Sequence, residues 1–101
     1  MKTQNLDAQT VRVTELPEVT AANATEVRDG VRAAITPTCR ILQMDLSQTA
    51  FLDSSGLGAL VGLHKTLRQQ DGVLQILHPT PAVAQLLELT RLHRLFEIVE
   101  K

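Results

Sequence analysis

The chain has 101 residues, enough for one small domain with a single hydrophobic core. Hydrophobic residues make up 44% of it, but two phenylalanines and no tyrosine or tryptophan predict an aliphatic core and argue against stacking on single-stranded nucleic acid. The formal net charge is −1, with 10 basic and 11 acidic residues interspersed, and without a basic run we expect no nucleic acid partner.

The single cysteine and the lack of long apolar runs bear on the cellular location of the protein. Cys39 cannot form an internal disulfide, and at the head of an apolar run it is expected to be a buried structural thiol. The N-terminal MKTQNLDAQT has no apolar stretch like that of a signal peptide. No uncharged apolar run reaches the roughly 18 residues of a membrane span. We expect a soluble, cytoplasmic protein with no membrane partner.

The first third of the chain predicts a strand and a helix. Residues 1–9 are expected to be weakly structured or to form a short edge strand. From Thr10, TVRVTEL alternates apolar and polar residues and predicts a strand that Pro17 ends. Residues 20–35 predict a helix with Thr20 as its N-cap, ended by Pro37. The apolar positions with helical spacing are Ala24, Val27, Val31, Ala34 and Ile35.

The middle third predicts a strand followed by a second helix. CRILQMDL is apolar enough to be a strand covered on both faces, as parallel strands usually are. After a short connection, FLD leads into a helix from Ser54 or Ser55 to about residue 70. Gly58 and Gly62 lie four residues apart in it, and we expect them to let its backbone approach a neighbour closely.

The last third completes an alternation of strands and helices. Asp71-Gly72 predicts a turn, VLQIL a strand, Thr80-Pro81 the start of a helix, and LFEIVE a last, edge strand. This order predicts an α/β fold with a mixed, mostly parallel sheet of four to five strands covered by three to four helices. We expect residues 1–101 to form a single domain.

The stretch FLDSSGLGAL, residues 51–60, places two serines where a strand gives way to a helix. A serine nucleophile needs a nearby base, and the pattern Gly-x-Ser-x-Gly is absent. His64 lies two or more turns into the same helix, too far along it to reach the serines, as an interior or half-buried residue. His78 closes a parallel strand and could face the same end of the sheet as the serines, but His78 and His93 are expected to be surface residues. We therefore expect no enzymatic activity.

Metal and cofactor sites are not expected either. The sequence has no CxxC, HExxH or Gly-Lys-Ser/Thr pattern. Asp45 and Asp53, eight residues apart, are a weak basis for a cation site.

The remaining roles for this loop are helix capping and phosphorylation. Asp53 or Ser54 can cap the helix, but one cap is sufficient and the motif supplies several candidates. The loop follows a parallel strand, at the end of the sheet where open α/β folds present functional groups. The N–H groups of a helix N-terminus also tolerate a phosphate well. A phosphoserine here should leave the fold intact and change how a partner sees the surface.

Three segments resemble the STAS domain family, and specifically the bacterial anti-sigma factor antagonists. They are CRILQMDLSQTAFLDSSGLGAL, which contains the family's Asp-Ser-Ser-Gly-Leu-Gly motif, then PEVTAANATEVRDGV and TPAVAQLLELTRLHRLFEIVE. The resemblance runs from Thr10 onwards, and it implies a STAS-like domain.

The resemblance implies a protein that binds an anti-sigma factor, an ATP-dependent serine kinase, and so frees a sigma factor. The kinase would phosphorylate the second serine, Ser55, which ends binding, and a metal-dependent serine phosphatase would reset the protein. A monomer that pairs with the kinase is expected. The other residues expected at the kinase contact are Asp53, Ser54, Gly56, Leu57, Thr20 and Asn23.

Two positions depart from the family pattern. Pro17 stands where glycine is usual, and Thr20 where aspartate is usual, which affects the choice of partner more than the fold. The alternative is a STAS scaffold subunit of a stress-signalling or lipid-transport complex. Such domains often lack the serine pair, which this chain retains.

Overall fold

The protein is described by a computed structural model that places residues 1–99. In chain order its elements are β1 (Lys2–Asn5), β2 (Thr10–Thr14), β3 (Glu18–Val19), α1 (Ala24–Ala34), β4 (Ile41–Asp45), β5 (Phe51–Leu52), α2 (Ser54–Arg68), β6 (Val73–Leu77), α3 (Pro81–Leu89), the 3₁₀ helix η1 (Leu92–Arg94) and β7 (Glu97–Val99).

The main sheet has five strands in the order β1-β2-β4-β6-β7. β1 runs antiparallel to β2, and the other neighbours are parallel. The predicted α/β fold with a mixed, mostly parallel sheet is confirmed, and residues 2–5 form the short edge strand. β7 is the opposite edge strand, as expected. Glu100, the last residue of the predicted strand LFEIVE, lies outside the described residues, as does Lys101.

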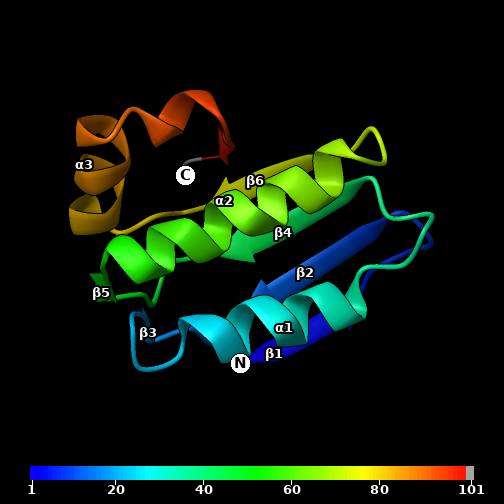
Figure 1. The fold of residues 1–101 in the computed structure, drawn as a ribbon, viewed down its shortest axis with the longest axis horizontal. Coiled ribbons are helices and arrows are strands. Elements are labelled where there is room, and N and C mark those ends of the chain that lie inside the picture. Colours follow the sequence, from blue (N-terminus) through cyan, green and yellow to red (C-terminus); the bar gives the residue numbers. More distant parts are fainter. Residues whose placement is uncertain (100–101) are drawn as a thin grey trace.

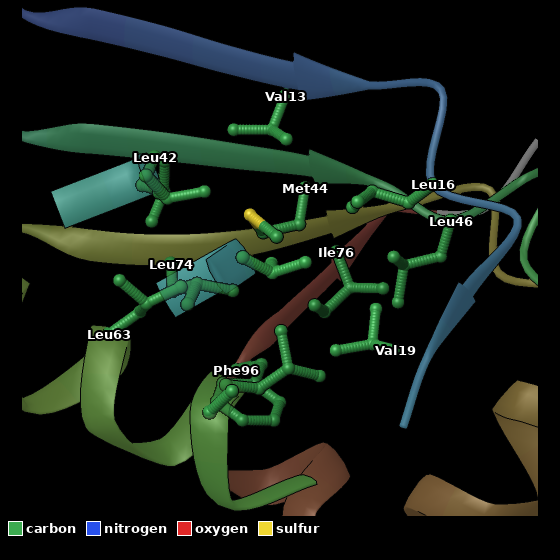
Figure 2. Close-up of a cluster of buried hydrophobic side chains, with 14 of the residues drawn as sticks. Val13, Leu16, Val19, Leu42, Met44, Leu46, Leu63, Leu74, Ile76 and Phe96 are labelled. Carbon is green, nitrogen blue, oxygen red and sulfur yellow. The ribbon is translucent and has the colours of Figure 1, made fainter. Parts of the chain in front are cut away.

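One face of the sheet carries the core. Helices α1 and α2 lie side by side across it (Figure 1), and the strands turn alternate side chains toward them. Figure 2 shows these side chains meeting Leu63 of α2 and Phe96 of the C-terminal segment. The fully buried strand residues are Val11, Val13, Leu42, Met44, Leu74 and Ile76. As the composition predicts, this core is almost entirely aliphatic.

The other face of the sheet carries a row of polar side chains across four strands and no helix of residues 1–99 lies over it, so the expectation that CRILQMDL is covered on both faces is wrong. Gln43 of β4 is partly exposed and lies in register between Arg12 of β2 and Gln75 of β6. Arg12 Nε donates to Gln43 Oε1 at 2.9 Å, and Gln43 Nε2 donates to Gln75 Oε1 at 3.0 Å. Gln75 in turn donates to the carboxylate of Glu97, its register partner in β7. This amide ladder needs no helix over it, because its polar groups are paired along the sheet.

Helix α1 begins later than predicted. Its N-cap is Asn23, and Thr20 lies in the turn before the helix, so the assignment of Thr20 as N-cap is wrong. The carbonyl oxygen of Thr20 accepts the backbone N–H groups of Asn23 and Ala24 at 3.0 and 2.7 Å. Those two hydrogen bonds close residues 20–23 into a turn, so the helix begins only at Ala24.

Two titratable side chains, one buried and one half-buried, pack against the core. Cys39 is 1% exposed, and burial raises the pKa of its thiol. His64 is half-buried on α2, with its ring edge-on to Phe96 at 5.8 Å between centroids. Desolvation, and secondarily the charge of Arg68, lower the pKa of this imidazole. Both results agree with the structural roles predicted for them.

Candidate functional site

The parallel strands β2, β4 and β6 end on the same side of the molecule, where a second, smaller sheet stands. Figure 1 shows β3, β5, α3 and the first turn of α2 gathered there. β3 and β5 pair in parallel over two residues each, with Val19 opposite Leu52. Ala50 N also donates to the carbonyl of Pro17 at 2.9 Å. This small sheet fixes the chain immediately before the serine pair.

Asp53 joins the start of α2 to the turn before α1. It is the N-cap of α2, and its Oδ1 accepts from Gly56 N at 2.9 Å. Its Oδ2 accepts from Ala21 N at 3.0 Å, across 32 residues of sequence. The backbone N–H groups of Gly56 and then Ala21 hold the pKa of Asp53 below its ordinary value. One carboxylate therefore fixes two loops relative to each other.

Gly56 is the glycine that permits close approach, not Gly58 or Gly62 as expected. A Cβ on Gly56 would lie 1.9 Å from the carbonyl oxygen of Val19 and 2.7 Å from Cδ1 of Leu52. A Cβ on Gly58 would meet nothing within 4 Å, and on Gly62 it would make an ordinary 3.6 Å contact with Arg32. The first turn of α2 is thus pressed against β3 and β5 through Gly56.

The two serines are the first residues of α2, and both side chains are exposed. Ser55 is nine residues before His64, which at 1.5 Å per residue is roughly 13 Å along the helix axis. A hydrogen bond between Ser55 and His64 is therefore impossible, as expected. Leu57 is half-buried and packs against the core, so only part of it is available to a partner.

The predicted residues of the first-helix turn do lie at this site. Asn23 Oδ1 accepts from Thr20 N at 2.9 Å, and Asn23 Nδ2 donates to the carbonyl of Glu18 at 2.9 Å. The Asn23 side chain thus holds the turn in shape, and the Ala21–Asp53 bond holds the turn against α2. Residues 20–23 and the exposed parts of residues 53–55 and 57 therefore lie side by side, and we call them the serine surface; Gly56 is buried beneath it.

We predict that Asp53→Asn destabilises the protein more at neutral pH than in acid. An asparagine oxygen can still accept from Gly56 N, but the Ala21 bond and the charge are lost. Because the pKa of Asp53 is lowered by folding, its carboxylate stabilises the fold above the ordinary value of 3.8. That contribution disappears as the pH falls through the folded-state pKa.

Urea unfolding of both proteins at pH 7 and at pH 3 measures this effect. The difference in unfolding free energy between wild type and Asp53→Asn should shrink at pH 3. An equal difference at both values would mean that the charge of Asp53 plays no part.

Within residues 1–99, no group of three or more His, Cys, Asp and Glu side chains is arranged to hold a metal ion. No helix in this part of the chain is long and apolar enough to cross a membrane.

The profile of the STAS domain family matches residues 4–101. The chain belongs to the STAS domain family. It is similar to the anti-sigma-B factor antagonist of Listeria monocytogenes, with 31% identity over 81 residues, covering 80% of this chain and 71% of the relative. That name describes antagonism of a protein factor, which is a binding role and not catalysis.

Solved structures share the fold of this STAS domain. The anti-sigma factor antagonist SpoIIAA in its unphosphorylated form superposes with a TM-score of 0.84, at 20% identity, over 99% of this chain and 88% of SpoIIAA. Bacillus SpoIIAA in its phosphorylated form gives a TM-score of 0.76, at 19% identity, over 99% and 91%. At these identities the comparison establishes the architecture alone.

The sequence of this STAS domain does not reveal two features of the serine surface. The Ala21 N–H contributes through the backbone, so no residue type marks it. Phe51 reads as one more apolar strand residue, yet its side chain is 66% exposed beside the serines.

Proposed function

We propose that this protein is an anti-sigma factor antagonist that switches partners. In this proposal the unphosphorylated form binds an anti-sigma serine kinase and so frees its sigma factor. Phosphorylation of Ser55 by that kinase ends binding, and a serine phosphatase restores the protein. The observation that carries the proposal is the exposed Ser55 in the first turn of α2, on a loop that Asp53 holds in place.

The local physics supports a modification that acts on binding and not on folding. A phosphate on Ser55 would bring about −1.5 to −2 charges at neutral pH. The helix N-terminus is the end of α2 that accommodates negative charge. Asp53 carries a like charge next to it, which offsets part of that stabilisation. The added charge is tolerated in water but is costly to bury under a partner.

The relatives support the same reading. The relative from Listeria monocytogenes is named as an anti-sigma-B factor antagonist. One of the solved structures with this fold is SpoIIAA in its phosphorylated form. The kinase contact in this proposal is the serine surface, with Asp53, Ser54, Ser55 and the exposed part of Leu57 on one side and residues 20–23 on the other. Gly56 is buried, and its part in the proposal is to hold the first turn of α2 in place. The proposed place of action is the cytoplasm, where an ATP-dependent kinase is available.

Phosphopeptide mapping tests the proposal directly. The purified protein is incubated with ATP and each candidate anti-sigma serine kinase of the same genome, beside Ser55→Ala and Ser54→Ala. We expect phosphate on Ser55 in the wild type and in Ser54→Ala, and none in Ser55→Ala. Phosphate retained at a comparable rate by Ser55→Ala would move the site to Ser54. Stable binding to a large complex without any phosphate would favour the scaffold role.

A further inference from the structure

Of the two phenylalanines in the chain, Phe96 is buried in the core and Phe51 is exposed to solvent. Phe96 is 4% exposed, whereas Phe51 of β5 is 66% exposed. Phe51 forms one wall of a shallow groove of about 140 Å³ between β5 and α3. The groove is lined by Ala50, Phe51, Leu52, Ala82, Val83 and Leu86. We call it the Phe51 groove.

Hydrogen bonds hold the two walls of the groove together before any partner arrives. Thr49 is fully buried, and its Oγ1 donates to the carbonyl of Leu16 at 2.5 Å. The carbonyl of Thr49 accepts from Oγ1 of Thr80, the N-cap residue of α3, at 3.0 Å. The chain leading into β5 is thereby tied to the start of α3. A preformed apolar groove loses less conformational entropy on binding than a mobile one.

The groove lies within reach of any kinase that modifies Ser55. Phe51 and Ser55 are four residues apart, so their Cα atoms are separated by at most roughly 14 Å. A protein interface of standard size covers roughly 800 Å² on each partner, equivalent to a disc of about 16 Å radius. β5 and the first turn of α2 stand at the same end of the molecule (Figure 1). An interface of standard size centred on Ser55 is therefore large enough to include Phe51.

We propose that the Phe51 groove receives an apolar side chain of the anti-sigma kinase, which anchors the kinase beside the serine surface. This inference rests on the proposed function, and it adds the N-terminal half of α3 to the interface. The aromatic side chain supplies apolar contact area that does not depend on the charge state of Ser55. The groove thus provides affinity, and Ser55 provides the regulation.

Binding measurements with two groove variants test this inference. Phe51→Ala removes one wall, and Ala82→Arg fills the groove from an exposed position in the first turn of α3. Leu89→Ala removes an exposed leucine from the other end of the same helix, where the side chain is 74% exposed, and serves as the matched control. Affinity for each candidate anti-sigma serine kinase is measured by calorimetry with ADP, so that no phosphate is transferred.

We expect both groove variants to bind the kinase at least tenfold more weakly than the wild type, and Leu89→Ala to bind within twofold. Circular dichroism and urea unfolding show whether each variant is folded, and Ala82→Arg carries the test if Phe51→Ala is not.

Three results would overturn the inference. If both groove variants bind within twofold of the wild type while Ser55→Asp is weakened, the groove lies outside the interface and the proposed function stands. If no candidate kinase binds the wild type, the proposed function fails and the groove assignment fails with it. If sedimentation shows a wild-type dimer that Phe51→Ala converts to a monomer, a second copy of this chain occupies the groove.

Discussion

Replacing Gly56 with alanine is expected to lower the free energy of unfolding by about 3 kcal/mol, at the upper end of the cost of overpacking a well-packed site. The new methyl group would lie 1.9 Å from the carbonyl oxygen of Val19, which is backbone and cannot rotate away. Either α2 moves out or β3 and β5 separate. In both cases the bonds from Asp53 to Gly56 and Ala21 are strained. Urea unfolding followed by circular dichroism gives the change.

Gly58→Ala is the matched control for this experiment. Gly58 lies two residues further along the same helix, is exposed, and has open space where a Cβ would go. Alanine is a better helix former than glycine by roughly 1 kcal/mol, so this variant should be more stable than the wild type by up to that amount. Opposite signs are therefore expected for the same substitution two residues apart. A neutral Gly56→Ala would show that the first turn of α2 is not held against β3.

Introducing Ser55→Asp is expected to leave the protein folded and to weaken kinase binding at least tenfold. Aspartate is favourable in the first turn of a helix, so the stability of the fold should be nearly unchanged. Under a docked kinase the new carboxylate lies beside Asp53, and two like charges in a desolvated contact oppose binding. Calorimetry with the kinase and ADP measures the affinity, and circular dichroism checks the fold.

Two controls make the Ser55→Asp result specific. Ser55→Ala should bind the kinase as tightly as the wild type but accept no phosphate. Ala33→Glu adds the same unit of charge at an exposed position in the last turn of α1, and should leave the affinity within twofold. Equal affinity of Ser55→Asp and the wild type would contradict a charge-based release. An unfolded Ser55→Asp would show that the first turn of α2 is not a tolerant surface.

Local signals in the sequence were sufficient for most elements of the fold. Alternation marked β2, helical spacing marked α1 and α2, and Thr80-Pro81 marked the start of α3 at the residue where it begins. The sequence leaves Asp53 and Ser54 as candidates for the N-cap of α2, and the structure assigns it to Asp53. These features are set by residues only a few positions apart in the chain, so they can be recognised in the sequence.

The errors arose where a distant segment decides the outcome. Gln43 lies within the mostly apolar run CRILQMDL, and its partners in the ladder, Arg12 and Gln75, are about thirty residues away on either side. The same holds for Gly56 of α2, because Val19, against which it packs, belongs to the distant strand β3. Thr20 has the residue type of an N-cap, but the turn that its carbonyl closes moves the helix start to Asn23.

The amide ladder, formed by Arg12, Gln43, Gln75 and Glu97, marks the face of the sheet that is exposed to solvent. Each of its bonds joins residues in direct register, and the row begins on a guanidinium and ends on a carboxylate, so every amide has one orientation that satisfies both neighbours. Displacing β4 or β6 by one residue would turn its core side chains toward water and break two bonds of the row, and displacing β2 or β7 would break one. Four residues spread over 86 positions of the chain therefore favour one alignment of β2, β4, β6 and β7, from the face of the sheet opposite the core.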